Sequence, residues 1–151
     1  MNTRDISTRA LGHIGEEAAA LYLTGHGYTV LARNLYIGHA EIDLLAETDS
    51  CFVFVEVKTR RQAADTKTAY GTPASAVDAK KQAVLLSAAD RYLAEHPTDK
   101  IPRIDVVEVY VSPTEDTFTV TEVRHFENAV RRTSRFARET GRKKRYYDET
   151  D

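Results

Sequence analysis

The sequence predicts one α/β domain with a mixed, roughly five-stranded sheet flanked by helices. At 151 residues, the chain is long enough for one hydrophobic core and short for two. Hydrophobic residues make up 42% of it and charged residues 29%, a composition typical of a globular protein. Segments with helical and strand-like patterns follow one another in the order helix, three strands, helix, two strands, which indicates an α/β class.

The first half of the chain is predicted to form a helix and three strands. The alanine-rich stretch "EEAAALYL" favours a helix over residues 6–25, which Gly25 and Gly27 end. A short strand, a loop with the sequence "LYIGHA" and two further strands follow. The turn-like "ETDS" between the last two is short enough to indicate an antiparallel hairpin. These strands are expected at residues 28–34, 41–46 and 51–59.

The second half is predicted to add one helix and a pair of strands. Residues 60–73 are polar and are interpreted as an exposed loop. Asp78 is expected to cap the helix "AKKQAVLLSAADRYLAEH", whose apolar residues recur at helical spacing. The runs "RIDVVEVYV" and "TFTVTEV" are typical of strands and are expected to join around Ser112 and Pro113. The helix is expected at residues 79–96 and the strands at residues 103–111 and 117–123.

Basic residues are concentrated near the end of the chain. Residues 1–123 carry 12 Lys and Arg against 18 Asp and Glu, whereas residues 124–151 carry 9 against 5. Basic side chains release condensed counterions when they bind nucleic acid. We therefore expect a globular domain over residues 1–130 and a basic arm, helical or disordered, over residues 131–151. A solvated tail without a partner is the alternative that charge leaves open.

Cysteine usage and hydropathy predict a cytoplasmic protein. Cys51 is the only cysteine in the sequence, so no internal disulfide can form. There is no apolar segment near the first residue and no apolar run of membrane-spanning length. The expected partners therefore exclude a membrane.

The stretch "FVFVEVKTR" over residues 52–60 combines a strand pattern with charge. Side chains alternate between the two faces of a strand, so Glu56 and Lys58 share a face. If the hairpin turns near Asp49, Asp43 lies across from residue 55 or 56 and its carboxylate can meet that of Glu56. Lys58 would then lie roughly 6–7 Å further along its strand.

Two converging carboxylates indicate a site for a hard cation. Mg²⁺ or Mn²⁺ typically takes one or two carboxylates, with water and phosphate oxygens as its other ligands. Such an ion lowers the pKa of a bound water and neutralises charge that develops on phosphorus. The ammonium of Lys58 could orient the water or contact the phosphate. The alternative is a surface Glu–Lys ion pair, which contributes little to stability.

The motifs as an ordered series resemble the YraN family of bacterial proteins. They are "GHIGEEAAALYLTGHGY", "ARN", "AEIDLLA" and "VFVEVKTR", followed by "YGTPASAV", "RIDVV" and "HFENAV", and they cover roughly residues 9–130. This family is similar to the PD-(D/E)xK nuclease superfamily, close to archaeal Holliday-junction resolvases. The resemblance implies a resolvase-like, restriction-endonuclease-like fold for residues 1–130.

The resemblance also implies roles for individual residues. Asp43 matches the aspartate of the superfamily motif, although Ile42 replaces the preceding proline, and Glu56 and Lys58 match its E-x-K. Glu16 matches the glutamate of the first helix that often completes such metal sites. The implied metal ligands are Asp43, Glu56 and Glu16, and these with Lys58 form the implied catalytic set.

Three further residues are expected to contact the substrate, namely Lys81, Gln82 and Arg60. The pattern of the first helix does not itself distinguish Glu16 from Glu17, because two apolar stripes on nearly opposite sides compete. The choice of Glu16 therefore depends on the resemblance.

The implied activity is that of an Mg²⁺- or Mn²⁺-dependent DNA endonuclease acting on branched or structured DNA. RNA is not excluded, and a homodimer would suit a symmetric junction. A nucleic-acid-binding or scaffold protein that keeps the fold without catalysis is the alternative. The chain departs from the family at Ala40, where a glycine is usual, and in "YIGH", where arginines are usual. Tyr36 and His39 could contact nucleic acid there instead.

Overall fold

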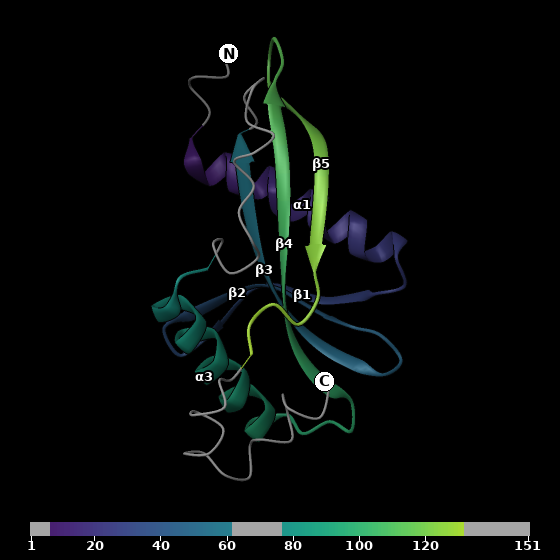
Figure 1. Ribbon diagram of the computed structural model, residues 1–151, viewed down its shortest axis with the longest axis vertical. Coiled ribbons are helices and arrows are strands. Elements are labelled where there is room, and N and C mark those ends of the chain that lie inside the picture. The colour runs from purple at the N-terminus through teal and green to yellow at the C-terminus, as the bar shows by residue number, and fades with distance from the viewer. Residues whose placement is uncertain (1–6, 62–76, 132–151) are drawn as a thin grey trace.

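The computed structural model describes residues 7–61 and 77–131 of the chain (Figure 1). These residues form two long helices and a sheet whose strands follow the predicted order. The helices are α1 (Thr8–Gly25) and α3 (Ala79–Glu95). The strands are β1 (Thr29–Ile37), β2 (Ala40–Glu47), β3 (Cys51–Arg61), β4 (Ile101–Pro113) and β5 (Phe118–Phe126).

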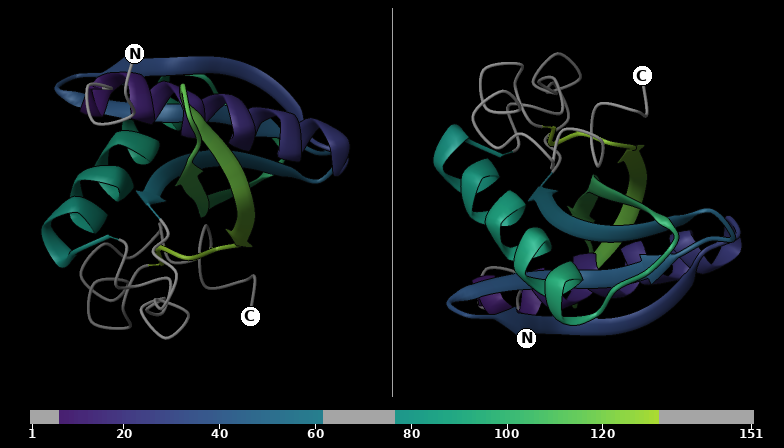
Figure 2. Two further views of the ribbon diagram at one scale, coloured as in Figure 1. Left: turned by 90° about the horizontal axis from the view of Figure 1, so that it is seen from above. Right: turned by 90° about the horizontal axis from the view of Figure 1, so that it is seen from below.

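The five strands form one mixed sheet in the order β1-β2-β3-β4-β5. All neighbours are antiparallel except β3 and β4, which run parallel from the pair Cys51 and Ile101 to the pair Arg61 and Val111. Helix α3 lies between these two strands in the chain, as a parallel connection requires. β1 and β2 run across the direction of β4 and β5, so the sheet is strongly twisted (Figures 1 and 2).

Each face of the sheet packs against one helix. Phe52 and Phe54 of β3 belong to the core that faces α3, whereas Val53 and Val55 belong to the core that faces α1. Helix α1 passes behind β3, β4 and β5 in Figure 1. The predicted α/β class, with a mixed five-stranded sheet flanked by helices, is confirmed, and the arrangement is consistent with a resolvase-like fold.

Both helices begin at the kind of residue that the sequence predicts. The Ser7 hydroxyl accepts a hydrogen bond from the backbone N–H of Ala10 at 3.1 Å. The Asp78 carboxylate accepts one from the N–H of Lys81 at 2.8 Å, which confirms its predicted capping role. Neither helix is long and apolar enough to cross a membrane in the part of the chain that the structure describes.

Two predicted turns are misplaced. Most of "LYIGHA" is strand rather than loop, because β1 continues to Ile37 and β2 starts at Ala40. The turn between them is short, and Gly38 supplies a positive φ of 63°. β4 also continues through Pro113, so the next turn lies at residues 114–117. A proline at the last position of a strand interrupts no further ladder hydrogen bonds.

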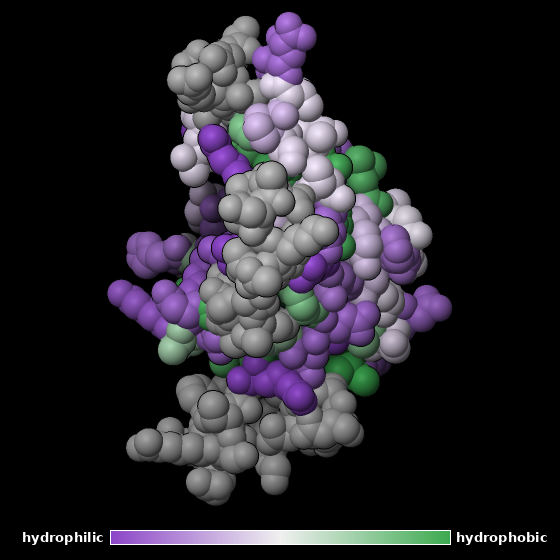
Figure 3. Space-filling view, turned by 45° about the horizontal axis from the view of Figure 1, so that its top comes forward, coloured by the Kyte–Doolittle hydropathy of each residue, from purple (hydrophilic) through white to green (hydrophobic). Residues whose placement is uncertain are grey.

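The remaining predictions on organisation lie partly outside the described residues. Arg60 and Arg61 belong to β3, and the rest of the predicted loop up to residue 73 lies outside, as do residues 132–151 of the basic arm. Val130 is 1% exposed and belongs to the core that faces α3, so the packed part of the described residues includes residue 130. On the face shown in Figure 3, the described surface is mostly hydrophilic, with apolar side chains in small separate groups.

A candidate acidic site at the end of the hairpin between strands β2 and β3

The register of the β2–β3 hairpin brings two carboxyl groups together. Leu44 pairs with Val55, so the next positions along the two strands are Asp43 and Glu56, as the hairpin geometry predicts. They share a pocket of about 280 Å³ with residues of α1. Its lining residues are Thr8, Leu11, Gly12, Glu16, Asp43, Glu56, Val57 and Thr59.

A close approach of α1 to β3 forms the other wall of this pocket. Gly15 is buried against Thr59, and a Cβ atom added at Gly15 would lie 1.7 Å from the Thr59 Oγ1 atom. No side chain fits at that position, so glycine allows the helix to lie directly on the strand. The next residue along the helix is Glu16, which this contact places beside the hairpin.

Asp43 is held by the backbone of the neighbouring strand. Its Oδ2 atom accepts a hydrogen bond from the N–H of Val57 at 2.8 Å. Burial raises the pKa of Asp43 to about 7, helped by the negative charge of Glu56, although the hydrogen bond from Val57 opposes the shift. The charge of Glu16 and a hydrogen bond with the Glu56 side chain add to the rise. Two carboxyl groups this close share a proton readily, and a cation would relieve the same repulsion.

Glu56 is the more buried member of the pair and has two lysines beside it. The residue is 5% exposed. Its Oε2 atom lies 3.8 Å from the Nζ atom of Lys58 on the same strand and 4.0 Å from that of Lys81 on α3. Three elements therefore meet at this point, because β2 supplies Asp43, β3 supplies Glu56 and Lys58, and α3 supplies Lys81.

Glu16 lines the same pocket, and an asparagine holds it in place. The Nδ2 group of Asn34 donates to Glu16 Oε1 at 3.1 Å and to Glu41 Oε2 at 2.9 Å. Glu17, by contrast, is exposed and pairs with Arg33. The structure thus places Glu16, rather than its neighbour, at the acidic site.

Sequence reasoning missed Asn34, although two signals pointed to it. It belongs to the quoted motif "ARN", and asparagine is uncommon inside strands. Asn34 adopts a φ of 51°, in the left-handed region that asparagine tolerates better than most residues. This conformation lies in the middle of β1, where the side chain reaches both glutamates.

Two of the three expected substrate contacts lie elsewhere. The Nε2 group of Gln82 donates to the backbone carbonyl of Val77 at 2.8 Å, just before α3. The Nε atom of Arg60 lies 3.6 Å from Glu108 Oε2 on the adjacent strand β4. Neither side chain lines the acidic pocket. Lys81 does not line the pocket either, but its Nζ atom lies 4.0 Å from Glu56 Oε2, so it is the one of the three that lies beside the acidic pair.

The donor set suits a hard cation that keeps water or phosphate among its ligands. Among residues 7–61 and 77–131, no three His, Cys, Asp or Glu side chains are close enough together to hold a metal ion. The pocket instead offers the adjacent oxygens of Asp43 and Glu56, with Glu16 nearby. Mg²⁺ commonly binds through one or two carboxylates and completes its shell with water and substrate phosphate, so the residues fit such an ion.

A second buried polar cluster joins β4, β5 and the start of β1. Asp105 is fully buried and accepts hydrogen bonds from Arg103 at 2.8 and 2.9 Å, from His125 Nε2 at 2.7 Å and from the N–H of Asn128 at 2.9 Å. Burial raises the pKa of Asp105, but these hydrogen bonds outweigh it and leave the pKa below its usual value. Arg103 also donates to the Tyr28 hydroxyl at 2.6 Å. The cluster links β4 to β5 and to the start of β1, and so stabilises the sheet.

The sequence matches one family over most of the described fold. Residues 15–109 match the uncharacterised protein family UPF0102. A UPF0102 protein of Symbiobacterium thermophilum is 47% identical over 107 residues, which are 70% of this chain and 86% of that protein. One of Caldanaerobacter subterraneus is 37% identical over 127 residues, which are 83% of this chain and 98% of that protein. One of Syntrophotalea carbinolica is 40% identical over 121 residues, which are 80% of this chain and 90% of that protein.

Proposed function

We propose that this chain, which belongs to the UPF0102 family, is a metal-dependent endonuclease acting on branched or structured DNA. UPF0102 is the YraN family that its motifs indicate. The observation that carries this proposal is the pairing of two carboxyl groups, Asp43 and Glu56, beside two lysines. Carboxylates of this kind bind hard cations, and lysines attract phosphate. In metal-dependent phosphodiester hydrolysis, both kinds of group neutralise charge on the phosphate.

Asp43 and Glu56 would hold an Mg²⁺ or Mn²⁺ ion, and Glu16, which lines the same pocket, would hold one of the waters that complete the shell of the ion. When bound, the ion would supply positive charge to the scissile phosphate and favour ionisation of the attacking water. The N–H of Val57 fixes the orientation of the Asp43 carboxylate. The pocket around these groups is formed by α1 and β3, which limit the directions from which a phosphate can enter.

The two lysines have separate tasks in this proposal. Lys58 lies on the strand that carries Glu56, so its ammonium is held close to the reacting phosphate and stabilises the charge that develops there. Lys81 reaches Glu56 from α3, and its half-exposed ammonium can leave the carboxylate to bind a neighbouring phosphate of the DNA. Both roles require the Glu56 carboxylate to be ionised. A cation bound to this carboxylate would keep it ionised.

The test is a cleavage assay on a labelled panel of a four-way junction, a flap, a duplex, single-stranded DNA and RNA. Each is incubated with Mn²⁺, Mg²⁺ or a chelator, and the wild type is compared with Asp43→Asn. We expect cleavage of branched DNA that requires the metal and falls at least about 100-fold in the variant, since charge stabilisation at such sites contributes that much or more. Full activity in Asp43→Asn would refute the site.

Two results would lead to other conclusions. Binding of DNA without cleavage under every condition would favour a scaffold protein that keeps the nuclease fold. Preferential cleavage of RNA would keep the reaction and change the substrate.

A further inference from the structure

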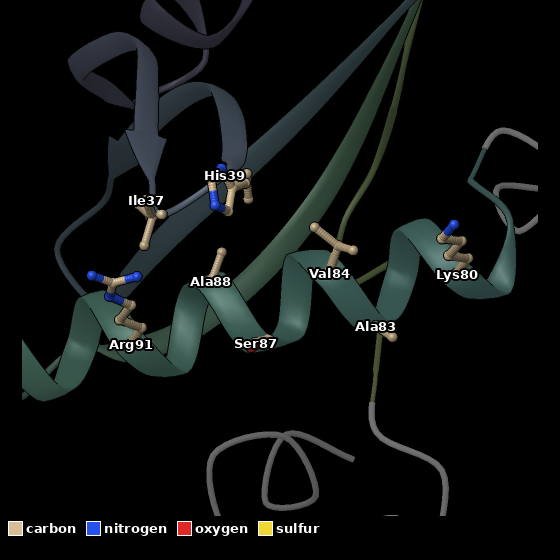
Figure 4. Close-up of a pocket in the computed structure, with 10 residues that line it drawn as sticks. Ile37, His39, Lys80, Ala83, Val84, Ser87, Ala88 and Arg91 are labelled. Atoms are coloured by element: carbon tan, nitrogen blue, oxygen red, sulfur yellow. The ribbon is translucent and has the colours of Figure 1, made fainter.

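A second pocket, of about 550 Å³, lies between α3 and the turn that joins β1 to β2. Its apolar part includes Ile37, Ala40, Val84 and Ala88. Figure 4 shows Val84, Ala88 and Arg91 projecting from α3 toward the turn that carries His39. The pocket therefore has an apolar floor with basic groups around it.

Arg91 is seated directly on the backbone of this turn. A Cβ atom added at Gly38 would lie 2.7 Å from the Nη1 atom of Arg91, and Gly38 has a positive φ of 63°. Glycine adopts this positive φ without strain. The guanidinium therefore lies close to the backbone of the turn, at the rim of the pocket.

Several basic side chains elsewhere in the described part of the fold pair with carboxylates. Lys58, Lys81 and Lys100 each lie beside a carboxylate, as do Arg33 and Arg103. Within residues 7–61 and 77–131, Lys80, His39 and Arg91 form no ion pair with a carboxylate. Basic side chains that converge on a pocket without acidic partners favour an anionic ligand.

We propose that this pocket binds an unpaired nucleotide of the substrate, an inference that rests on the proposed nuclease function. The base would lie on the apolar floor, stacked against His39 or the plane of the Arg91 guanidinium. Its phosphates would contact Lys80 and Arg91. Proteins recognise single-stranded nucleic acid through this combination of stacking surfaces and basic groups.

Helix α3 connects this pocket to the acidic site. Lys81 lies 4.0 Å from Glu56, and its neighbour Lys80 lines the pocket. Arg91 lies further along the same helix, about 16 Å from Lys80 at 1.5 Å per residue. A strand that follows α3 could place one phosphate at the acidic site and an unpaired nucleotide in the pocket. The pocket would then select branched or frayed DNA over a fully paired duplex.

The experiment measures binding in chelator, so that it does not depend on cleavage. Fluorescence anisotropy gives the Kd for a labelled duplex with a short single-stranded flap and for the same duplex without it. We expect the wild type to bind the flapped DNA about tenfold more tightly, the scale of one stacked base. Two variants remove the preference in different ways, because Val84→Trp fills the pocket and Arg91→Gln removes a charge.

Matched controls separate the pocket from general effects. Val84 is 39% exposed and Val120, on β5, is 40% exposed, so Val120→Trp introduces the same side chain at a similarly exposed position. Arg33→Gln removes one exposed arginine from β1, outside the pocket. Both controls should keep the flap preference of the wild type, and thermal unfolding checks that all four variants fold.

Several outcomes would overturn the inference. One is equal affinity of the wild type for the two DNAs, and another is an unchanged flap preference in both pocket variants. The third is displacement of flapped DNA by polyglutamate but not by a single-stranded oligonucleotide, which would assign the pocket to an acidic peptide. The variant Asp43→Asn distinguishes failure of the nucleotide-pocket proposal from failure of the proposed nuclease function. If that variant still cuts DNA, the nuclease site is wrong whatever the pocket binds. If it binds flapped DNA normally and does not cut, the nuclease site stands and the pocket is judged by its own variants.

Discussion

At the scale of single residues, the acidic site is held in an unfavourable electrostatic state. Asp43 and Glu56 lie side by side in a partly buried pocket, and burial together with the charge of Glu56 raises the pKa of Asp43 to about 7. An aspartate in an unfolded chain ionises near pH 4. Between these pH values the folded protein holds a proton that the unfolded chain has lost. The free energy of unfolding therefore falls as the pH rises through this range.

Replacing Asp43 with asparagine should therefore stabilise the fold at high pH while it removes activity. The amide of Asp43→Asn cannot ionise, and it can still accept the hydrogen bond from Val57. In chelator at pH 8, urea unfolding should show a free energy of unfolding higher than that of the wild type by on the order of 2 kcal/mol. At pH 4 the difference should nearly vanish.

Asp49→Asn is the control, because Asp49 lies exposed in the turn between β2 and β3 and should change stability little at either pH. Adding Mn²⁺ at pH 8 should stabilise the wild type and leave Asp43→Asn nearly unchanged. A variant that is less stable than the wild type at pH 8 in chelator would contradict this account of the pair.

Asn34 should act as a positioning residue for Glu16. The variant Asn34→Gly accepts the positive φ of 51° but loses the amide that holds Glu16 and Glu41. We expect kcat for metal-dependent cleavage to fall about tenfold while KM for DNA changes little, because a displaced Glu16 affects the chemical step more than binding. A rise in KM alone would mean that Asn34 contacts the substrate.

At the scale of secondary-structure elements, the position of α1 depends on one contact. Gly15 lies directly on Thr59, whereas nothing lies within 4 Å of a Cβ atom added at Gly12 in the same helix. Because Glu16 follows Gly15, the contact determines both the stability of the helix–sheet interface and the place of one acidic side chain.

The two glycines should therefore respond in opposite ways to the same substitution. Gly15→Ala forces α1 away from β3 and should lower the free energy of unfolding by about 1–3 kcal/mol. Gly12→Ala should raise it by about 0.5–1 kcal/mol, since alanine favours a helix. Thermal unfolding of both variants measures the contrast. Equal effects would show that the helix can shift on the sheet without cost.

The elements also show how far sequence reasoning reaches. The alternation of "FVFVEVKTR" with the short turn "ETDS" was enough to predict that Asp43 meets Glu56, because both facts are local to one hairpin. The two competing apolar stripes of α1 did not allow its orientation to be predicted. That orientation depends on the close approach of Gly15 to Thr59, and these residues are far apart in the chain. The same holds for Lys81, which a helix from the other side of the sheet brings to Glu56. The wrong turn at Ser112 and Pro113 arose because the last position of a strand can hold a proline, which interrupts no further ladder hydrogen bonds.

At the scale of the whole molecule, charge is divided between the packed domain and the arm. Within residues 7–61 and 77–131, the basic residues Lys80, His39 and Arg91 line the second pocket and form no ion pair with a carboxylate. The sequence beyond residue 131 carries seven more basic residues and only four acidic ones. The basic residues are Arg132, Arg135, Arg138, Arg142, Lys143, Lys144 and Arg145.

Removing the arm should weaken the salt dependence of DNA binding. Truncation after Arg131 keeps Val130 in the core, and we expect the slope of log Kd against log salt concentration to fall by at least about 2, since each phosphate contact contributes about 0.9. A full-length chain with glutamine at the seven basic positions should show the same change. An unchanged slope in both proteins would identify the arm as a solvated tail.

The placement of Val130 in the core has a consequence for how the protein is made. The N–H of Ala129 donates to the backbone carbonyl of Ile104 at 2.8 Å, and Val130 fills the core beside α3. Asp43, Glu56 and Lys58 are all translated in the first half of the chain, but the core around them closes only when residue 130 has left the ribosome. A nascent chain would thus carry its acidic residues long before it carries a finished site.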